Sequence, residues 1–147
     1  MTVIPSSCSP DPEAWAYSVC VPHDARAGRV ARAAVRAALE VHELPELIDR
    51  ALLVGSELLG NALVHTGGEA QLRMKWAGER LRLTVWDASP KPPDFRAVGT
   101  SSESGRGLHL VQVLADRWGY YPLPVSLVGV ESKVTWCELG RRPAVAW

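Results

Sequence analysis

Two polar side chains one helical turn apart, Glu57 and Asn61, are the most informative residues of this 147-residue chain. They lie in the apolar segment 52–65, where residues i and i+4 fall on one side of a helix. A carboxylate and a carboxamide held together in this way can supply a general base and a metal-binding oxygen. Such a pair is more often a solvated surface, so it establishes no site alone. The opposite side of the predicted helix is apolar and carries Leu52, Gly55, Leu58, Leu59, Ala62 and Leu63.

Two further segments supply what nucleotide chemistry would still need. Asp87 ends an apolar strand pattern, and its carboxylate can accept a hydrogen bond from an exocyclic amine such as adenine N6, worth about 1.5–3 kcal/mol. Gly105 and Gly107 open a predicted helix, where small residues and free N–H groups suit phosphate, and Arg106 can add positive charge. Mg²⁺ prefers oxygen ligands and is often shared with phosphates, which the carboxamide oxygen of Asn61 fits. The order and spacing of these weak signals favour a nucleotide site.

Composition bounds the remaining possibilities. The length predicts one domain, and a formal net charge of zero argues against direct nucleic-acid or anionic-membrane binding. No apolar run approaches the ~20 residues of a membrane span, and the N-terminus lacks the pattern of a secretory signal. Cys8, Cys20 and Cys137 form neither a disulfide framework nor a zinc pattern. We therefore expect a cytoplasmic protein without a membrane anchor.

The hydrophobic periodicity predicts alternating and helical segments around these residues. Two consecutive strands joined by a hairpin turn at 77–79 favour an α+β sandwich, with a mixed, mostly antiparallel sheet covered on one face by helices. Segment 88–104 is loop-like. The expected strands cover 15–21, 70–76, 81–85, 118–123 and 133–139; the expected helices run from an Asp24 N-cap to about His42, from Pro45 to near Thr66, and from about Arg106. The predicted domain is 14–140, between a flexible N-terminal tail at 1–13 and a C-terminal tail at 141–147.

The first predicted helix has two distinct sides. Its arginines lie on an arc of their own, which is either a solvated face or a docking surface for an acidic partner, and the sequence leaves both open. The expected buried side carries Ala27, Val30, Ala34, Ala37, Ala38 and Val41, and the arc carries Arg26, Arg29, Arg32 and Arg36.

These motifs together resemble the Bergerat-fold (GHKL) ATPases, which include the histidine kinases. Within them the chain is most similar to the stand-alone anti-sigma-factor serine kinases, over roughly residues 15–140. The segment 56–67 resembles the N box of that family, 85–90 its first glycine box, 105–111 with 114–119 its second, and 133–139 its closing strand.

The resemblance implies an ATP-dependent serine/threonine protein kinase. Glu57 would be the catalytic base, Asn61 would bind Mg²⁺, and Asp87 would hold adenine. Family members phosphorylate a serine on an anti-anti-sigma (STAS) protein, can sequester a sigma factor, and commonly form homodimers. The resemblance thus implies transcription regulation through these partners.

The second glycine box would contact the phosphates. Gly105 and Gly107 would hinge a lid, residues 94–104, over them, and Arg106 and Leu108 belong to the same nucleotide-binding segment.

The chain departs from the family pattern at two places. Ser89 and Lys91 replace the glycines of the usual Asp-x-Gly-x-Gly box. Thr135 lies one residue later than the threonine often found near adenine, and a one-residue shift in a strand reverses the face, so Thr135 is left out of the predicted site.

These departures keep an alternative function open: a non-catalytic Bergerat-fold module that sequesters a sigma or anti-anti-sigma factor. The catalytic half of a two-component histidine kinase is disfavoured, because the chain has no room for a phospho-accepting helical hairpin.

Overall fold

The computed structural model describes residues 12–66, 68–89, 93 and 103–141. The predicted tail residues 1–11 and 142–147, and residues 94–102 of the predicted lid, lie outside this part of the chain.

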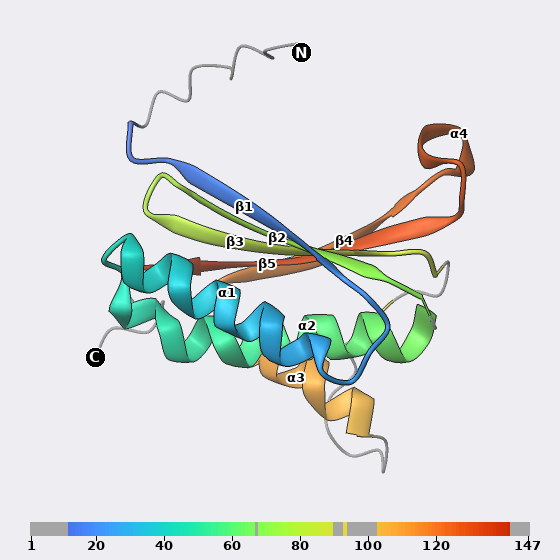
Figure 1. Cartoon of the computed structure of the whole chain (residues 1–147), viewed down its shortest axis with the longest axis horizontal. Coiled ribbons are helices and arrows are strands. Elements are labelled where there is room, and N and C mark those ends of the chain that lie inside the picture. The colour runs from blue at the N-terminus through green and yellow to red at the C-terminus, as the bar shows by residue number, and fades with distance from the viewer. Residues whose placement is uncertain (1–11, 67, 90–92, 94–102, 142–147) are drawn as a thin grey trace.

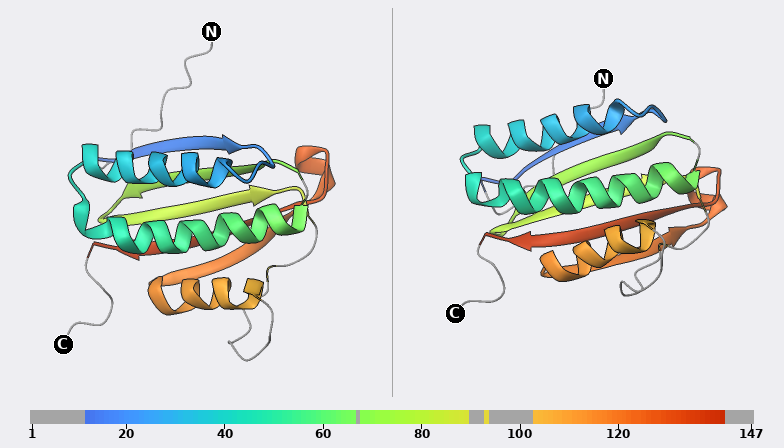
Figure 2. Two further views of the ribbon diagram at one scale, coloured as in Figure 1. Left: turned by 60° about the horizontal axis from the view of Figure 1, so that its bottom comes forward. Right: turned by 90° about the horizontal axis from the view of Figure 1, so that it is seen from below.

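One antiparallel sheet and three covering helices make up the fold (Figure 1). The sheet has the order β1-β2-β3-β5-β4, and every adjacent pair of strands is antiparallel. The helices α1, α2 and α3 lie on one face, as Figure 2 shows, which confirms the predicted fold class. The strands are β1 (Trp15–Val21), β2 (Ala70–Ala77), β3 (Arg80–Asp87), β4 (Arg117–Leu123) and β5 (Ser132–Gly140); the helices are α1 (Ala27–Val41), α2 (Ile48–Thr66), α3 (Glu103–Leu114) and the short α4 (Val125–Val128).

The alternation of apolar residues places the core between sheet and helices. In β2 and β3 every second side chain is buried, as period-2 patterning predicts. Gly78 and Glu79 form the two-residue turn between them with φ of 57° and 63°, a left-handed pair that matches the twist of a hairpin. The inward residues of the two strands are Ala70, Leu72, Met74 and Trp76, and Leu81, Leu83, Val85 and Asp87.

The buried side predicted for α1 was wrong in part: Ala27 and Ala38 are buried as expected, but two valines are exposed. Val30 and Val41 are 64% and 75% exposed, while Leu39, the largest apolar side chain of the helix, is fully buried. The helix has two overlapping apolar arcs, and the one that packs between the sheet and α2 is the one containing Leu39. The buried residues of α1 are Ala27, Ala31, Val35, Ala38 and Leu39.

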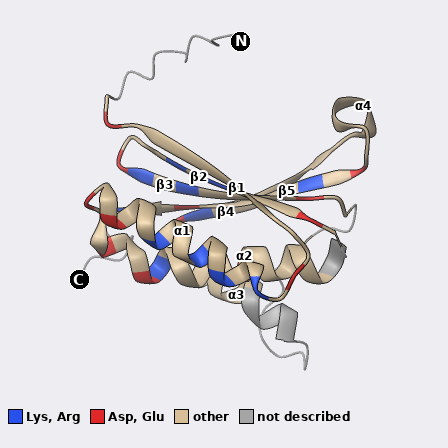
Figure 3. Cartoon of the chain, viewed as in Figure 1, with Lys and Arg blue, Asp and Glu red and all other residues tan. Residues whose placement is uncertain are grey.

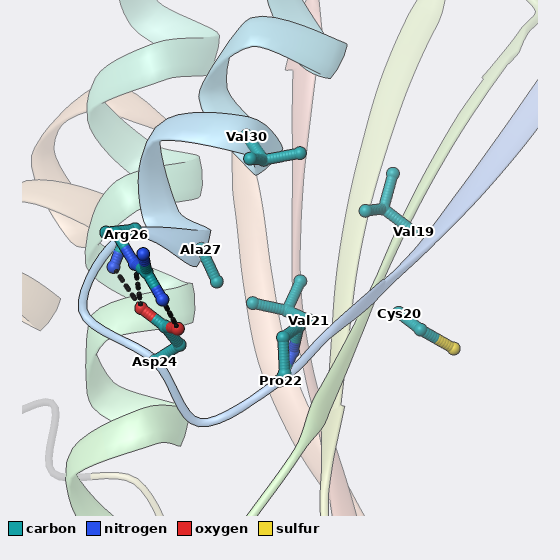
Figure 4. Close-up of a pocket in the computed structure, with 8 residues that line it drawn as sticks. All are labelled: Val19, Cys20, Val21, Pro22, Asp24, Arg26, Ala27 and Val30. Atoms are coloured by element: carbon teal, nitrogen blue, oxygen red, sulfur yellow. Dashed lines mark hydrogen bonds and ion pairs between the residues drawn. The ribbon is translucent and has the colours of Figure 1, made fainter.

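The start of α1 also differs from the prediction. Arg26, not Asp24, occupies the N-cap, and no side chain caps the helix. The Asp24 carboxylate instead accepts a hydrogen bond from the Arg26 N–H at 2.8 Å and pairs with its guanidinium (Figure 4). These hydrogen bonds lower the pKa of Asp24.

Two further helix boundaries differ from the prediction, and one short helix was not predicted. Pro45 begins a 3₁₀ turn, Pro45–Leu47, and the α-helix starts after it at Ile48. The third helix begins at Glu103, about one turn before the predicted start near Arg106. The short helix α4 was not predicted. Within the described residues, no helix has the length and apolar character that crossing a bilayer requires.

Candidate functional site

One end of the sheet gathers the residues singled out in the sequence. Asp87 ends β3, and the register aligns it with Ala70 at the start of β2 and Lys133 near the start of β5. Since α2 leads directly into β2, its second half lies at this same end (Figure 2). The His23 ring nitrogen Nε2 lies 3.1 Å from the Leu63 carbonyl oxygen, which ties the loop after β1 to the same part of α2.

Asn61 is buried with an unsatisfied amide. Its side chain is 6% exposed, and Nδ2 has no hydrogen-bond partner among the described residues. Glu57, one turn earlier on α2, is half-buried. Because buried polar atoms nearly always have partners, an orphaned amide beside a carboxylate is what a site that awaits a polar ligand would show.

Asp87 is buried and already paired. Its Oδ1 accepts hydrogen bonds from the Ser89 backbone N–H at 2.9 Å and from the Lys133 ammonium at 2.8 Å. Both charged side chains are only 1% exposed. The carboxylate predicted to hold adenine therefore belongs to a buried ion pair between β3 and β5.

The sequence analysis missed Lys133. Its signal was present: in the alternating strand 133–139 it occupies an inward position, where a core side chain is expected. Only the pairing of Lys133 with Asp87 in the β3–β5 register explains a buried ammonium there.

Of the residues that depart from the family pattern, Ser89 and Thr135 have described positions, and Lys91 lies outside the described residues. Ser89, which replaces the family's glycine, is buried, and its backbone N–H donates a hydrogen bond to the Asp87 carboxylate. Thr135 pairs with Val85 and is buried on the helix-covered face, the same face as Asp87. The expectation that Thr135 points away from that face was wrong, because the strand phase is set by Leu139 and Cys137, which are fully buried.

The second glycine motif lies inside α3. Gly105, Arg106 and Gly107 fall within its first turns, so the helix starts before the glycines and does not open at them. Its first four residues, 103–106, have backbone N–H groups without intrahelical acceptors, which suits an anion. Leu108 is fully buried in the core, so its side chain packs the helix onto the sheet. Helix α3 packs beside α2, and its first turn lies toward the same end of the sheet as the second half of α2 (Figure 2).

These residues fit a nucleotide bound to Mg²⁺. Asn61 would hold the metal through its amide oxygen, with phosphates and water as the other ligands, and the start of α3 would hold the phosphates. Among the described residues, no three His, Cys, Asp or Glu side chains cluster as a metal site. The Asn61 Nδ2, unpartnered among the described residues, is a donor that a phosphate oxygen would satisfy, and the Lys133–Asp87 pair changes how a base would be recognised.

Comparison with known proteins identifies the family of the chain. The family model described as the histidine kinase-like ATPase domain matches residues 21–123, from the last residue of β1 to the end of β4. No curated protein gives a match. The match covers more than half of the 147 residues, including Glu57, Asn61, Asp87 and the start of α3. The chain belongs to the histidine kinase-like ATPase domain family, an ATP-binding fold.

Proposed function

We propose that this protein is an ATP-dependent serine/threonine kinase of the anti-sigma-factor type. Its substrate would be a serine of an anti-anti-sigma (STAS) protein, and its output the release or capture of a sigma factor. The observation that supports the proposal is that Glu57 and Asn61 lie one turn apart on α2, which packs beside α3, the helix that contains Gly105 and Gly107.

The residues have separate roles in this reaction. ATP supplies the phosphoryl group when bound. Glu57 accepts the proton of the serine hydroxyl while the serine oxygen forms its bond to the γ-phosphorus and the bond to the β–γ bridging oxygen breaks, leaving ADP. Asn61 holds Mg²⁺ without adding negative charge next to the triphosphate, and the N–H groups of residues 103–106 stabilise phosphate charge.

The test is phosphate transfer from radiolabelled ATP to a STAS protein encoded beside this chain. The wild type is expected to label one serine, and Glu57→Gln to lower the rate by about 10²–10⁴-fold, the usual contribution of a general base. Asp49→Asn is the matched control, since it removes the same charge from the exposed far end of α2. Equal rates for Glu57→Gln and wild type, or no transfer to any such protein, would contradict the proposal.

One observation favours a second candidate function. The Asp87 carboxylate is neutralised by Lys133 within the described structure, which weakens its attraction for an adenine amine. A non-catalytic module that sequesters a sigma or anti-anti-sigma factor would need no adenine. In that case Asn61→Ala leaves partner capture in a pull-down unchanged whether or not ATP is added, whereas the kinase predicts capture that responds to ATP.

The proposed assembly is a homodimer formed through β1 and α1. β1 is an edge strand, paired only with β2 in the described sheet, so its outer edge can pair with another strand. Beside it lie two apolar grooves of about 310 and 300 Å³ between β1 and α1, the first shown in Figure 4. A second copy brings both an identical edge and an identical groove, so a single two-fold axis would cover them together.

A further inference from the structure

We propose that Lys133 is a base-reading residue, which together with Asp87 recognises the Watson–Crick edge of adenine. The inference rests on the proposed binding of ATP and deepens it. Asp87 would accept from the N6 amine, as the family resemblance implies, and Lys133 would donate to the neighbouring ring nitrogen N1. The matched family region ends at residue 123, so β5, which carries Lys133, lies beyond it.

The position of Lys133 is set by the sheet. Asp87 and Lys133 are cross-strand partners, so their side chains project to the same, helix-covered face. Their charged atoms are 2.8 Å apart. An acceptor and a donor are thus held side by side at the end of the sheet where α2 brings Asn61.

Burial makes a purely structural role a poor explanation. Both side chains are 1% exposed, and a buried ion pair of this kind is often no more stabilising than apolar residues of similar volume. Of the other inward positions of β5, Cys137 and Leu139 are apolar. Thr135, on the same face, has a buried Oγ1 without a partner among the described residues, a second polar atom that awaits a ligand.

The chemistry of the pair matches adenine better than guanine. Adenine presents one donor, the N6 amine, beside one acceptor, N1, and a base outside a duplex is recognised along this edge. Guanine presents two neighbouring donors, N1–H and N2–H, which a carboxylate binds best with both oxygens. In this chain Oδ1 of Asp87 accepts from Ser89 and Lys133, so the proposal assigns the N6 amine to Oδ2. One carboxylate oxygen of Asp87 and the ammonium of Lys133 therefore match the N6 donor and the N1 acceptor of adenine.

The experiment is calorimetric titration of wild-type protein with Mg²⁺ and four nucleotides: ATP, 1-deaza-ATP, 7-deaza-ATP and GTP. ATP is compared with 1-deaza-ATP, in which N1 becomes C–H, and with 7-deaza-ATP, which changes the other edge of the purine. We expect 1-deaza-ATP to bind at least tenfold more weakly than ATP, the range of a charge-assisted hydrogen bond, and 7-deaza-ATP to bind like ATP.

The variant Lys133→Met completes the cycle. It is expected to bind ATP and 1-deaza-ATP equally, because the group that distinguishes them is gone. Since Lys133→Met leaves a buried carboxylate unpaired, the doubly neutral Asp87→Asn/Lys133→Met variant is titrated as well, and the same equality is expected.

Four results would overturn the inference, and they differ from one another. Equal binding of ATP and 1-deaza-ATP by the wild type would show that Lys133 does not donate to N1. Tighter ATP binding by Lys133→Met would mean that the ion pair with Lys133 prevents Asp87 from binding adenine. Preference for GTP assigns the pair to another base. No binding of any nucleotide at millimolar concentration removes the proposed function itself, whereas the first three leave nucleotide binding intact.

Discussion

At the scale of single residues, the site contains two kinds of buried polar group. The Oδ1 atom of Asp87 accepts from Ser89 and Lys133, whereas the Nδ2 atom of Asn61 lacks an acceptor within the described structure. An unsatisfied buried donor costs about 1–3 kcal/mol, which the ligand-free protein must carry. Function and stability therefore oppose each other at Asn61.

Asn61→Leu tests this opposition, because it replaces the amide by an apolar group of similar shape. We expect the free energy of unfolding without nucleotide to stay equal or rise by about 1 kcal/mol, since the orphaned donor is removed. The stabilisation by Mg²⁺-ATP, about 2.7 kcal/mol at a hundred times Kd for the wild type, should disappear. Urea unfolding with and without Mg²⁺-ATP measures both quantities. A strongly destabilised variant that still gains stability from Mg²⁺-ATP would contradict the assignment.

The described cysteines give a second residue-scale prediction. Burial raises the pKa of the Cys137 thiol to about 12, while Cys20 is exposed. The folded state keeps this thiol protonated after the unfolded chain has ionised, so its contribution to stability is complete below about pH 9 and falls as pH rises toward about 12. In a Cys8→Ser background, Ellman's reagent should label one thiol in the native protein and two in urea. Cys137→Ala should flatten the fall in stability above about pH 9; two native thiols would show that Cys137 is accessible.

At the scale of elements, the sequence predicted the central strands β2 and β3 well, because they alternate apolar and polar residues. β1 matches the predicted 15–21. β2 extends one residue beyond the predicted 70–76, and β3 extends the predicted 81–85 by one residue at its start and two at its end. The buried face of α1 was missed in part, because that helix is rich in alanine and valine on two arcs and only the position of α2 selects between them. Lys133 was missed for a related reason: its role depends on the pairing of β3 with β5, two strands separated by α3 and β4.

Two glycines in different elements should respond oppositely to alanine. Gly60 lies in the middle of α2 with no atom within 4 Å of an added Cβ, so Gly60→Ala should stabilise the protein by up to about 1 kcal/mol. Gly78 has φ +57° in the β2–β3 turn, so Gly78→Ala should destabilise it by about 1 kcal/mol. Urea unfolding of both variants against the wild type gives the two values. Changes of the same sign would mean that the turn or the helix differs from the described structure.

At the scale of the whole molecule, the described charges are of both signs and are spread over helices and strands (Figure 3). All four arginines of the α1 arc are exposed, Arg26 pairs with Asp24, and Arg36 lies 3.9 Å from Glu40, as a solvated face would have them. The apolar exposure is more distinctive, because Val30 and Val41 lie on α1 beside the grooves along β1. An edge strand next to an exposed apolar helix face leads to a prediction about assembly.

The wild type should sediment as a dimer at micromolar concentration, and Val41→Glu should weaken dimerisation by more than tenfold, because the interface would have to bury a carboxylate without a partner. Leu127→Glu is the control: Leu127 is 71% exposed, close to the 75% of Val41, but lies on α4 at the far end of the β4–β5 hairpin. Analytical ultracentrifugation over a concentration series gives the three dissociation constants. If the control dissociates the dimer instead, the interface involves α4; if the wild type is a monomer, β1 and α1 are free to bind the sigma or STAS partner directly.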